Sequence, residues 1–344
     1  MRDGLQMNLG PGAPVTLRDA QPYDAFLMTE DLSLRTAFTQ PFDPSGGDVL
    51  GFALNERRAG RPAVIVTLVA IDGASPRSPG AQMAIAEDGR FAGSISSGCL
   101  ERAIVEEARA ATARGEGGVV RYGKGSQFLD VVLPCGSGVD LLFTVNPSIE
   151  ALGAALEALS ERRPAALEFH PEGVRPAKAA ANDCNDEAFV RAYQPPLRIV
   201  AAGVGAEVIL LSQIARAGGY LVCAVSPDEK ALAQCLANQT VRLQSASSTP
   251  DLGLDPWTAV VFLFHDRDWE LSLLPPALAS TAFYIGAVGS RKTHAARLDA
   301  LRERGVSEQA LRRIAGPIGL IPATRDPSAL AVSVLAGVLA EWPY

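Results

Sequence analysis

The stretch from Arg198 to Glu229, reading RIVAAGVGAEVILLSQIARAGGYLVCAVSPDE, decides the fold of this chain. It contains an apolar run suited to a strand, a glycine turn, a helical segment closed by Gly218-Gly219, and a second apolar strand. That order is a βαβ unit of the expected length. Further strands are predicted at 257–264 and 282–285. We therefore expect an α/β fold in which residues 197–344 form a Rossmann-like domain with a mostly parallel sheet.

The glycine turn inside this unit is a partial dinucleotide-binding fingerprint. Gly203 and Gly205 match its first two glycines, whereas Val208 occupies the place of the third. Ser226 stands where a carboxylate would bind a ribose hydroxyl, and Asp228, two residues later, is a poor substitute. These departures disfavour an NAD(P) cofactor, and they weaken the fold prediction much less.

Polar groups follow the later strands of the predicted sheet, at the edge where open α/β sheets bind ligands. His265 and Asp266 come directly after the third strand. His265 is either a general acid or base, or a histidine that orients a loop through Asp266. After the fourth strand, a glycine turn enters a helix and forms a candidate phosphate site. The residues of this second turn are Gly286, Gly289, Ser290, Arg291 and Lys292.

A glycine-rich turn in the first half of the chain, Gly93 to Glu101 (GSISSGCLE), delivers a cysteine to the start of a predicted helix. Three- and four-residue spacing of apolar side chains extends that helix to about Ala113. Near its N-terminus, the helix dipole would favour a thiolate at Cys99. The alternative is that Cys99 is a small buried residue. Cys135 lies in a second glycine-flanked turn, where a structural role is favoured because no neighbour would activate the thiol.

Turn and strand signals divide the chain into four parts. Residues 1–47 form an extension with weak order, 48–163 a smaller α/β domain, 164–196 a linker, and 197–344 the Rossmann-like domain. Within the smaller domain we expect a helix at 48–59, strands at 63–71, 119–122, 128–133 and 139–145, a hairpin at Asp88-Gly89, and a helix opened by Pro147.

Composition excludes several classes of protein. The chain has 344 residues, a net charge of −7 and 48% hydrophobic residues, which describe a globular protein without the basic stripe that nucleic acid requires. No apolar run reaches transmembrane length, and the N-terminus lacks a secretory signal pattern, so we expect a cytoplasmic protein. The five cysteines have no zinc-ligand spacing, which indicates reduced thiols.

Several long segments, in order, resemble the xanthine dehydrogenase accessory protein family (XdhC/CoxI type). They are GASPRSPGAQM and GSISSGCLE in the first domain, and YIGAVGSRKTHAARLDALRERG, GPIGL and DPSALAVSVLA in the second. The resemblance covers about residues 48–344. Two positions depart from the family pattern: Ala206 or Glu207 replaces a histidine, and Phe264 replaces a threonine.

The resemblance implies a chaperone rather than an enzyme. Such a protein binds the molybdenum cofactor while a cysteine desulfurase helps to supply its sulfido ligand, and passes it to an apo molybdenum hydroxylase. It also implies a small N-terminal α/β domain joined to a Rossmann-like domain, commonly as a homodimer. Two rival functions remain: an NAD(P)-dependent oxidoreductase, and a cofactor-free scaffold that joins desulfurase and apo-enzyme.

The expected site follows from matching the cofactor to these residues. A thiolate suits molybdenum, and glycine turns at helix N-termini suit a phosphate. We expect Cys99 to face the metal, and Gly203, Gly205, Ser290 and Arg291 to bind the phosphate or pterin across an interdomain cleft. No catalytic residue is assigned. The full expected cofactor site is Ser94, Ser96, Gly98, Cys99, Glu101, Gly203, Gly205, His265, Asp266, Gly286, Gly289, Ser290 and Arg291.

Overall fold

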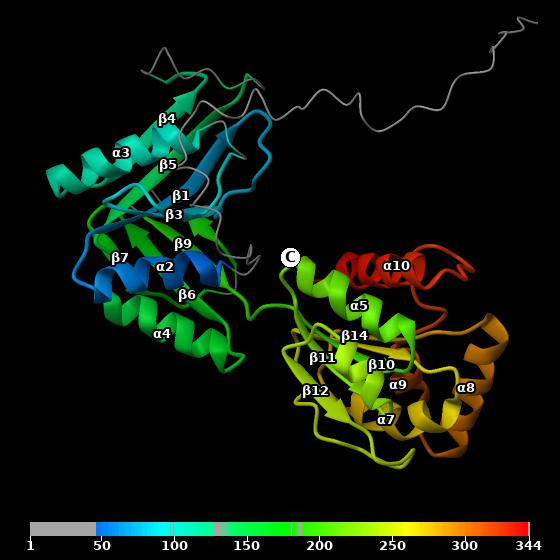
Figure 1. Ribbon diagram of the computed structural model, residues 1–344. Coiled ribbons are helices and arrows are strands. Elements are labelled where there is room, and N and C mark those ends of the chain that lie inside the picture. The colour runs from blue at the N-terminus through cyan, green and yellow to red at the C-terminus, as the bar shows by residue number, and fades with distance from the viewer. Residues whose placement is uncertain are drawn as a thin grey trace, which may run out of the picture.

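The computed structural model describes residues 46–96, 98, 100–126, 133, 136–179, 181–184 and 188–342. This part of the chain forms two lobes, the first built on two antiparallel sheets and the second on one parallel sheet (Figure 1). Nearly all of the expected extension and of the strand expected at 128–133 lies outside the described residues. So do both Cys99 and Cys135.

The main sheet of the first lobe has five strands in the order β3-β2-β1-β5-β4, and every neighbouring pair is antiparallel. The strands are β1 (Ala63–Asp72), β2 (Gln82–Ala86), β3 (Phe91–Gly93), β4 (Gly118–Gly123) and β5 (Gly138–Val145). The predicted hairpin at Asp88-Gly89 is confirmed, because Ile85 pairs with Phe91 across it. β1 lies at the centre of the sheet, which explains its nearly continuous run of apolar residues.

Helices cover both faces of this sheet. α3 (Glu101–Arg114) packs on one face, where it buries Ile104, Ala108 and Ala111. α2 (Gly47–Arg58) and α4 (Ile149–Ser160) pack together on the other face. Pro147 does not open α4 as expected. Ser148 is the N-cap instead, and its hydroxyl accepts a hydrogen bond from the Ala151 N–H at 3.2 Å.

The segment expected to be a linker contains a second sheet, in the order β7-β6-β9-β8. Its strands are β6 (Ala165–His170), β7 (Gly173–Pro176), β8 (Asp183–Cys184) and β9 (Phe189–Tyr193). Phe169, Val174 and Phe189 join the core beneath α2 and α4. These apolar side chains pack with the first lobe. The division of the chain into domains, with a linker at 164–196, stays a prediction.

A buried polar network around Gln82 joins the two sheets of the first lobe. The Gln82 amide donates to the Thr67 hydroxyl at 2.9 Å, and its carbonyl oxygen accepts from the Tyr193 hydroxyl at 2.6 Å. Arg191 also donates to that oxygen and lies over the Tyr193 ring. Each buried side chain therefore has a partner, which anchors β9 to β1 and β2.

The second lobe contains a six-stranded parallel sheet in the order β12-β11-β10-β13-β14-β15. The strands are β10 (Arg198–Gly203), β11 (Leu221–Ser226), β12 (Gln239–Arg242), β13 (Thr258–Leu263), β14 (Tyr284–Ala287) and β15 (Ile314–Ala315). The chain leaves β10 for β11 on one side and later returns to β13 on the other. The strand order therefore reverses between β10 and β13, which is where doubly wound sheets bind ligands.

Alternate residues of β10 point into two separate cores. Ile199 and Ala201 face one, and Val200 and Ala202 face the other. α5 (Ala206–Ala217), α6 (Glu229–Gln234) and α10 (Pro327–Ala340) cover the first face. α7 (Arg267–Ala279), α8 (Arg291–Glu303) and α9 (Glu308–Leu311) cover the second. The expected α/β fold, with a small first domain and a Rossmann-like second domain, is confirmed.

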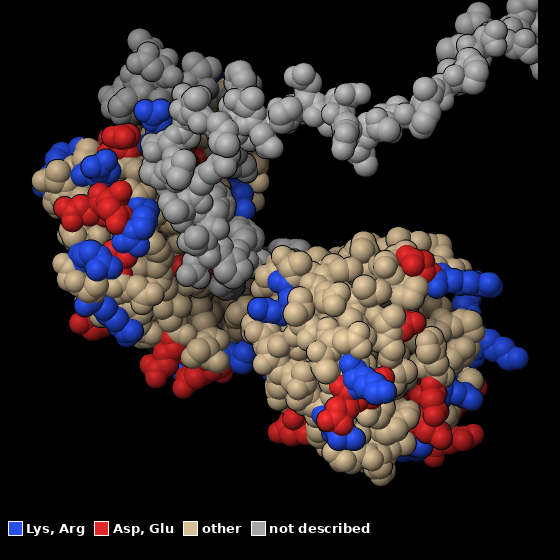
Figure 2. All heavy atoms as spheres, viewed as in Figure 1, with Lys and Arg blue, Asp and Glu red and all other residues tan. Residues whose placement is uncertain are grey.

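α10 packs against α5 and contains no charged residue over its length. Three exposed apolar residues lie together at this helix: Val332 within it, and Leu320 and Ile321 in the preceding loop, whose N–H groups bond to Ser333. We call these three residues the apolar patch. Figure 2 shows few charged side chains on the surface over α5 and α10. Among the described helices, none has the length and apolar content needed to cross a membrane.

Candidate functional site

The turn from Gly93 to Glu101 is organised around the carboxylate of Glu101, the first residue of α3. This carboxylate is buried and accepts hydrogen bonds from the Ser94 hydroxyl at 2.9 Å, the Ser96 N–H at 3.0 Å and the Gly98 N–H at 2.8 Å. The Ser96 hydroxyl and the Leu100 N–H also donate to it. Burial would raise the pKa of Glu101, but the hydrogen bonds from Ser96 and Ser94 outweigh burial and lower it.

These contacts give four of the expected site residues a structural role. Ser94, Ser96 and Gly98 direct polar groups at Glu101, so the carboxylate shapes the turn from within. Gly93 has a φ of 84°, and a Cβ there would lie 2.4 Å from the Gln82 carbonyl oxygen. Cys99, the expected metal ligand, falls between described residues, and α3 begins two positions after it. Cofactor binding by this turn stays a prediction.

At the reversal of strand order, two glycines permit close approach of backbone segments. A Cβ on Gly203 would lie 2.7 Å from the Leu263 carbonyl carbon, so glycine lets β10 and β13 end side by side. Gly205 has a φ of 76° and precedes α5 as its N-cap, without a side-chain cap of its own. Gly203 therefore lets the two strands end close together, and Gly205 leaves the N-terminus of α5 without a side-chain cap.

Glu207 and His265 meet across this turn. The Glu207 carboxylate lies 3.4 Å from Nε2 of His265, which follows β13. Its other oxygen lies 3.3 Å from the position a Cβ would occupy on Gly205. The Asp266 carboxylate caps α7 by accepting from the Asp268 N–H at 3.0 Å. The role of His265, as an acid or base or as the orienter of a loop, stays a prediction. Sequence reasoning noted Glu207 only as a departure from a family pattern and did not place it in the site.

The second glycine turn links β14 to α8. Gly286 lies within β14, and a Cβ there would be 2.6 Å from Tyr284 and Ile318 atoms, so this glycine serves packing. Gly289 has a φ of 129°. Ser290 caps α8 by accepting from the Thr293 N–H at 3.1 Å, and the side chain of Arg291 is exposed beside it.

A buried ion pair contacts this turn through the Val288 carbonyl, and sequence reasoning missed it. Arg297 and Glu270 are both fully buried, with Nε of Arg297 2.9 Å from Oε1 of Glu270. Arg297 also donates to the Val288 carbonyl at 2.6 Å. Burial raises the pKa of Glu270, and Arg297 opposes that rise. Arg297 lies four residues before the buried Leu301, a helical spacing that could have identified it as inward-facing.

The departures from the dinucleotide fingerprint are visible at the end of β11. Ser226 is buried, and its hydroxyl accepts from the Asp228 N–H at 3.1 Å. The Asp228 carboxylate in turn caps α6 by accepting from the Lys230 N–H at 2.9 Å. Both polar groups are engaged at the start of α6. Whether NAD(P) binds here stays a prediction.

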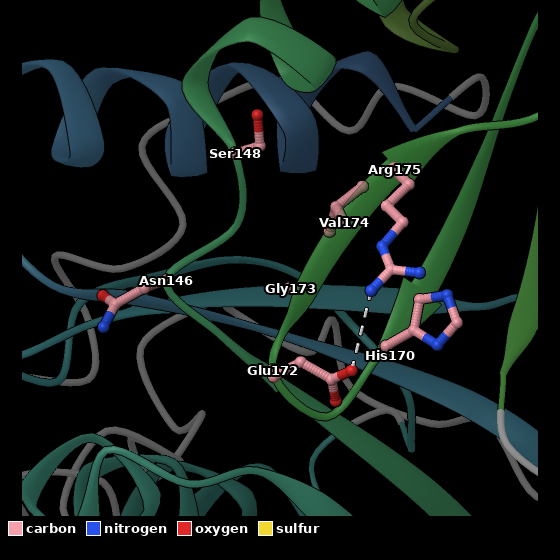
Figure 3. Close-up of a pocket in the computed structure, with 7 residues that line it drawn as sticks. All are labelled: Asn146, Ser148, His170, Glu172, Gly173, Val174 and Arg175. Carbon is pink, nitrogen blue, oxygen red and sulfur yellow. Dashed lines mark ion pairs between the residues drawn. The ribbon is translucent and has the colours of Figure 1, made fainter.

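A separate pocket of about 230 Å³ lies between the N-terminus of α4 and the β6–β7 hairpin. Figure 3 shows Arg175 extending toward Glu172, with the His170 ring beside it. His170 also lies 3.0 Å from the Glu168 carboxylate. None of the expected site residues lines this pocket. Among the described residues, no three His, Cys, Asp or Glu side chains gather as a metal site. The lining residues are Asn146, Ser148, His170, Glu172, Gly173, Val174 and Arg175.

The two lobes together define a class of protein with a helix-covered antiparallel domain followed by a Rossmann domain. Residues 199–338 match the XdhC Rossmann domain, and residues 56–123 match the XdhC and CoxI family. The chain is 36% identical over 293 residues to the molybdenum cofactor insertion chaperone PaoD of Escherichia coli K12, covering 84% of this chain and 86% of PaoD. The chain therefore belongs to the XdhC and CoxI family, as its motifs predicted.

Two more distant similarities extend over both lobes. The chain is 24% identical to YqeB of Escherichia coli K12, covering 81% of this chain and 43% of YqeB. A crystal structure described as a xanthine dehydrogenase from Bacillus halodurans superposes with a TM-score of 0.68 at 19% identity. That similarity covers 85% of this chain and 95% of the other, and it supports the two-lobed fold alone.

Proposed function

We propose that this protein is a chaperone that binds the molybdenum cofactor and supports its sulfuration and insertion into a molybdenum hydroxylase. The observation that carries the proposal is the 36% identity to PaoD, a molybdenum cofactor insertion chaperone, over 84% of this chain. The similarity is not confined to the Rossmann domain, which many unrelated proteins share. It spans both lobes and therefore includes the glycine turns at 93–101, 203–205 and 286–291.

Two of these turns suit the two ends of the cofactor: the turn before α8 suits its phosphate, and the turn before α3 suits its metal. In the second lobe, the capped N-terminus of α8 presents the exposed cation of Arg291, which suits a phosphate. In the first lobe, Glu101 orders the turn that precedes α3 and contains Cys99 in its sequence. A thiolate from this turn would be a suitable ligand for molybdenum.

The proposal includes partners and a location. An insertion chaperone of this kind meets an apo molybdenum hydroxylase, receives sulfur through a cysteine desulfurase, and works in the cytoplasm. We further propose a homodimer formed through the apolar patch of Leu320, Ile321 and Val332, because grouped exposed apolar residues favour association. Val332→Glu should shift the protein toward monomer in sedimentation velocity. Val119→Glu, at a somewhat more exposed position in the first lobe, is the control.

The decisive experiment measures equilibrium binding of molybdenum cofactor, released anaerobically from a donor enzyme, to the parent protein and to Cys99→Ala. We expect stoichiometric binding that is weakened in the variant and unaffected by NADP. Displacement by NADP would instead support a nicotinamide-dependent oxidoreductase. Failure to bind cofactor, together with retained binding to desulfurase and apo-enzyme, would support a scaffold. Equal binding by Cys99→Ala would show that the thiol does not hold the metal.

A further inference from the structure

We propose that the Glu207 carboxylate is the recognition group for the 2-amino-4-oxopyrimidine ring of a pterin, bound where β10 and β13 end. This inference rests on the proposed function and assigns one part of the cargo to one residue. It also changes the expected role of the turn at Gly203–Gly205. The turn would receive a neutral heterocycle that donates hydrogen bonds, and the phosphate would bind elsewhere.

The position of Glu207 is that of a ligand site. The strand order of the sheet reverses between β10 and β13, and such reversals open a crevice at the carboxyl ends of the strands. Gly203 ends β10, Glu207 lies in the first turn of α5, and His265 follows β13. The carboxylate thus projects from the first helix after the reversal, with an imidazole on the opposite side.

The carboxylate has unused capacity to accept hydrogen bonds. Its side chain is only 18% exposed, and an ionised carboxylate can accept about four hydrogen bonds. Among the described residues, its one ion-pair or hydrogen-bond partner is His265, at 3.4 Å and with a side chain 74% exposed. Largely buried polar groups normally find closer partners than this. A ligand that donates two hydrogen bonds would supply them.

The position of Glu207 disfavours a dinucleotide, which is the ligand that a glycine turn of this kind normally binds. A dinucleotide places its diphosphate against the N–H groups of a helix N-terminus. Here the carboxylate of Glu207 lies over Gly205, at the N-terminus of α5, and would repel the diphosphate. The positive end of the α5 dipole stabilises this negative charge where a phosphate would otherwise lie.

A pterin ring donates two hydrogen bonds and carries no negative charge for Glu207 to repel. Its ring N–H and its 2-amino group point the same way in one plane, so the two carboxylate oxygens can accept one hydrogen bond from each. Hydrogen bonds to a charged acceptor are stronger than those to a neutral one, and two of them add geometric specificity. Because a carbonyl replaces the 2-amino group in lumazine, that pteridine would turn an acceptor toward Glu207 and lose the pairing.

The experiment compares the intrinsic fluorescence of pterin and of lumazine on titration with the full-length protein. We expect the parent to bind pterin at least ~10-fold more tightly than lumazine. Glu207→Gln, whose amide nitrogen is a donor, should weaken pterin binding by ~10-fold or more and abolish the preference. Glu229→Gln is the matched control, because Glu229 is also a first-turn glutamate after a strand of this sheet and is exposed.

Equal binding of the two probes by the parent, or no binding of pterin up to millimolar concentration, would overturn the inference. So would an unchanged preference in a folded Glu207→Gln protein. Cofactor binding measured in parallel separates the two proposals. If the parent binds cofactor and Glu207→Gln binds it equally well, the role of Glu207 is refuted and the chaperone proposal stands. If the parent prefers pterin through Glu207 but binds no cofactor, the role of Glu207 stands and the chaperone proposal fails.

Discussion

Arg162 and Asp255 form a two-point ion pair that joins the first lobe to the Rossmann domain. Nε of Arg162 lies 2.7 Å from one carboxylate oxygen of Asp255, and Nη2 lies 3.0 Å from the other. The same guanidinium donates to the carbonyls of Pro196 and Trp257. Arg162 follows α4, and Asp255 precedes β13, so one side chain connects the end of a helix in the first lobe to the beginning of a strand in the second.

We expect Arg162→Ala to weaken the coupling between the two lobes. Loss of several charge-assisted hydrogen bonds at a mostly buried position should reduce the free energy of unfolding by about 1–3 kcal/mol. In differential scanning calorimetry, the unfolding transitions of the two lobes should be further apart in temperature in the variant than in the parent. The neighbouring Arg163→Ala is the control, because Arg163 is exposed and pairs only with Glu161 among the described contacts. An Arg162→Ala protein that unfolds as the parent does would contradict the expectation.

The same pair predicts a loss of stability in acid. Burial raises the pKa of Asp255, but hydrogen bonds from Arg162 and Thr258 outweigh burial and lower it. Because the folded-state pKa lies below the unfolded value of about 3.9, the pair stabilises the fold fully above about pH 5. That contribution is lost as pH falls below 4 through the folded-state pKa. Asp255→Asn should therefore flatten the acid limb of the pH–stability curve, measured by urea unfolding. A limb as steep as that of the parent would assign the acid sensitivity to other groups.

Glu101 should be required for the order of the turn before α3. Glu101→Gln replaces one acceptor oxygen with a donor that faces the N–H groups of Ser96 and Gly98, so buried donors lose their partner. We expect a loss of about 2–4 kcal/mol in the free energy of unfolding and weaker cofactor binding. Chemical denaturation and the cofactor titration measure the two effects. Glu106→Gln on the exposed side of α3 should change neither.

The buried pair of Arg297 and Glu270 should show strong non-additivity. Arg297→Met alone leaves an unpaired buried carboxylate, at a cost of about 3–5 kcal/mol. The double variant Arg297→Met with Glu270→Leu should recover much of that loss, because no charge is then buried. Urea unfolding of the parent, both single variants and the double variant measures the coupling energy. Additive losses would mean that the two side chains act independently.

Local sequence patterns predicted much of the Rossmann domain. The run RIVAAG became β10, the Gly203–Gly205 turn opened α5, and Gly218-Gly219 ended it, because strand propensity and glycine geometry act over a few residues. The hairpin at Asp88-Gly89 was predictable for the same reason. Family motifs then identified the order of the two domains.

Features that depend on distant contacts could not be predicted. The pairing of the four short strands within 165–193 into one sheet is not visible locally, because their apolar faces are short and lie beside a polar stretch. The inward direction of Glu101 was also hidden, since an acidic residue in a first helical turn is normally explained by the dipole. Its five donors come from a turn whose path is set by the neighbouring strands. The pairing of Glu207 with His265 joins residues 58 positions apart, and only the parallel register of β10 and β13 reveals it.

Because the sheet of β6 to β9 belongs to the first lobe, the connection between the lobes is short. Because β9 ends at Tyr193 and β10 begins at Arg198, the covalent connection between the lobes consists of Gln194, Pro195, Pro196 and Leu197. Fully extended, that connection spans at most about 18 Å, and its two prolines stiffen it. The short connection thus limits how far the lobes can separate, and the Arg162–Asp255 ion pair adds a second contact between them. A recipient enzyme would have to come to the bound cargo and fit against both lobes, so shape recognition by the partner becomes part of the transfer.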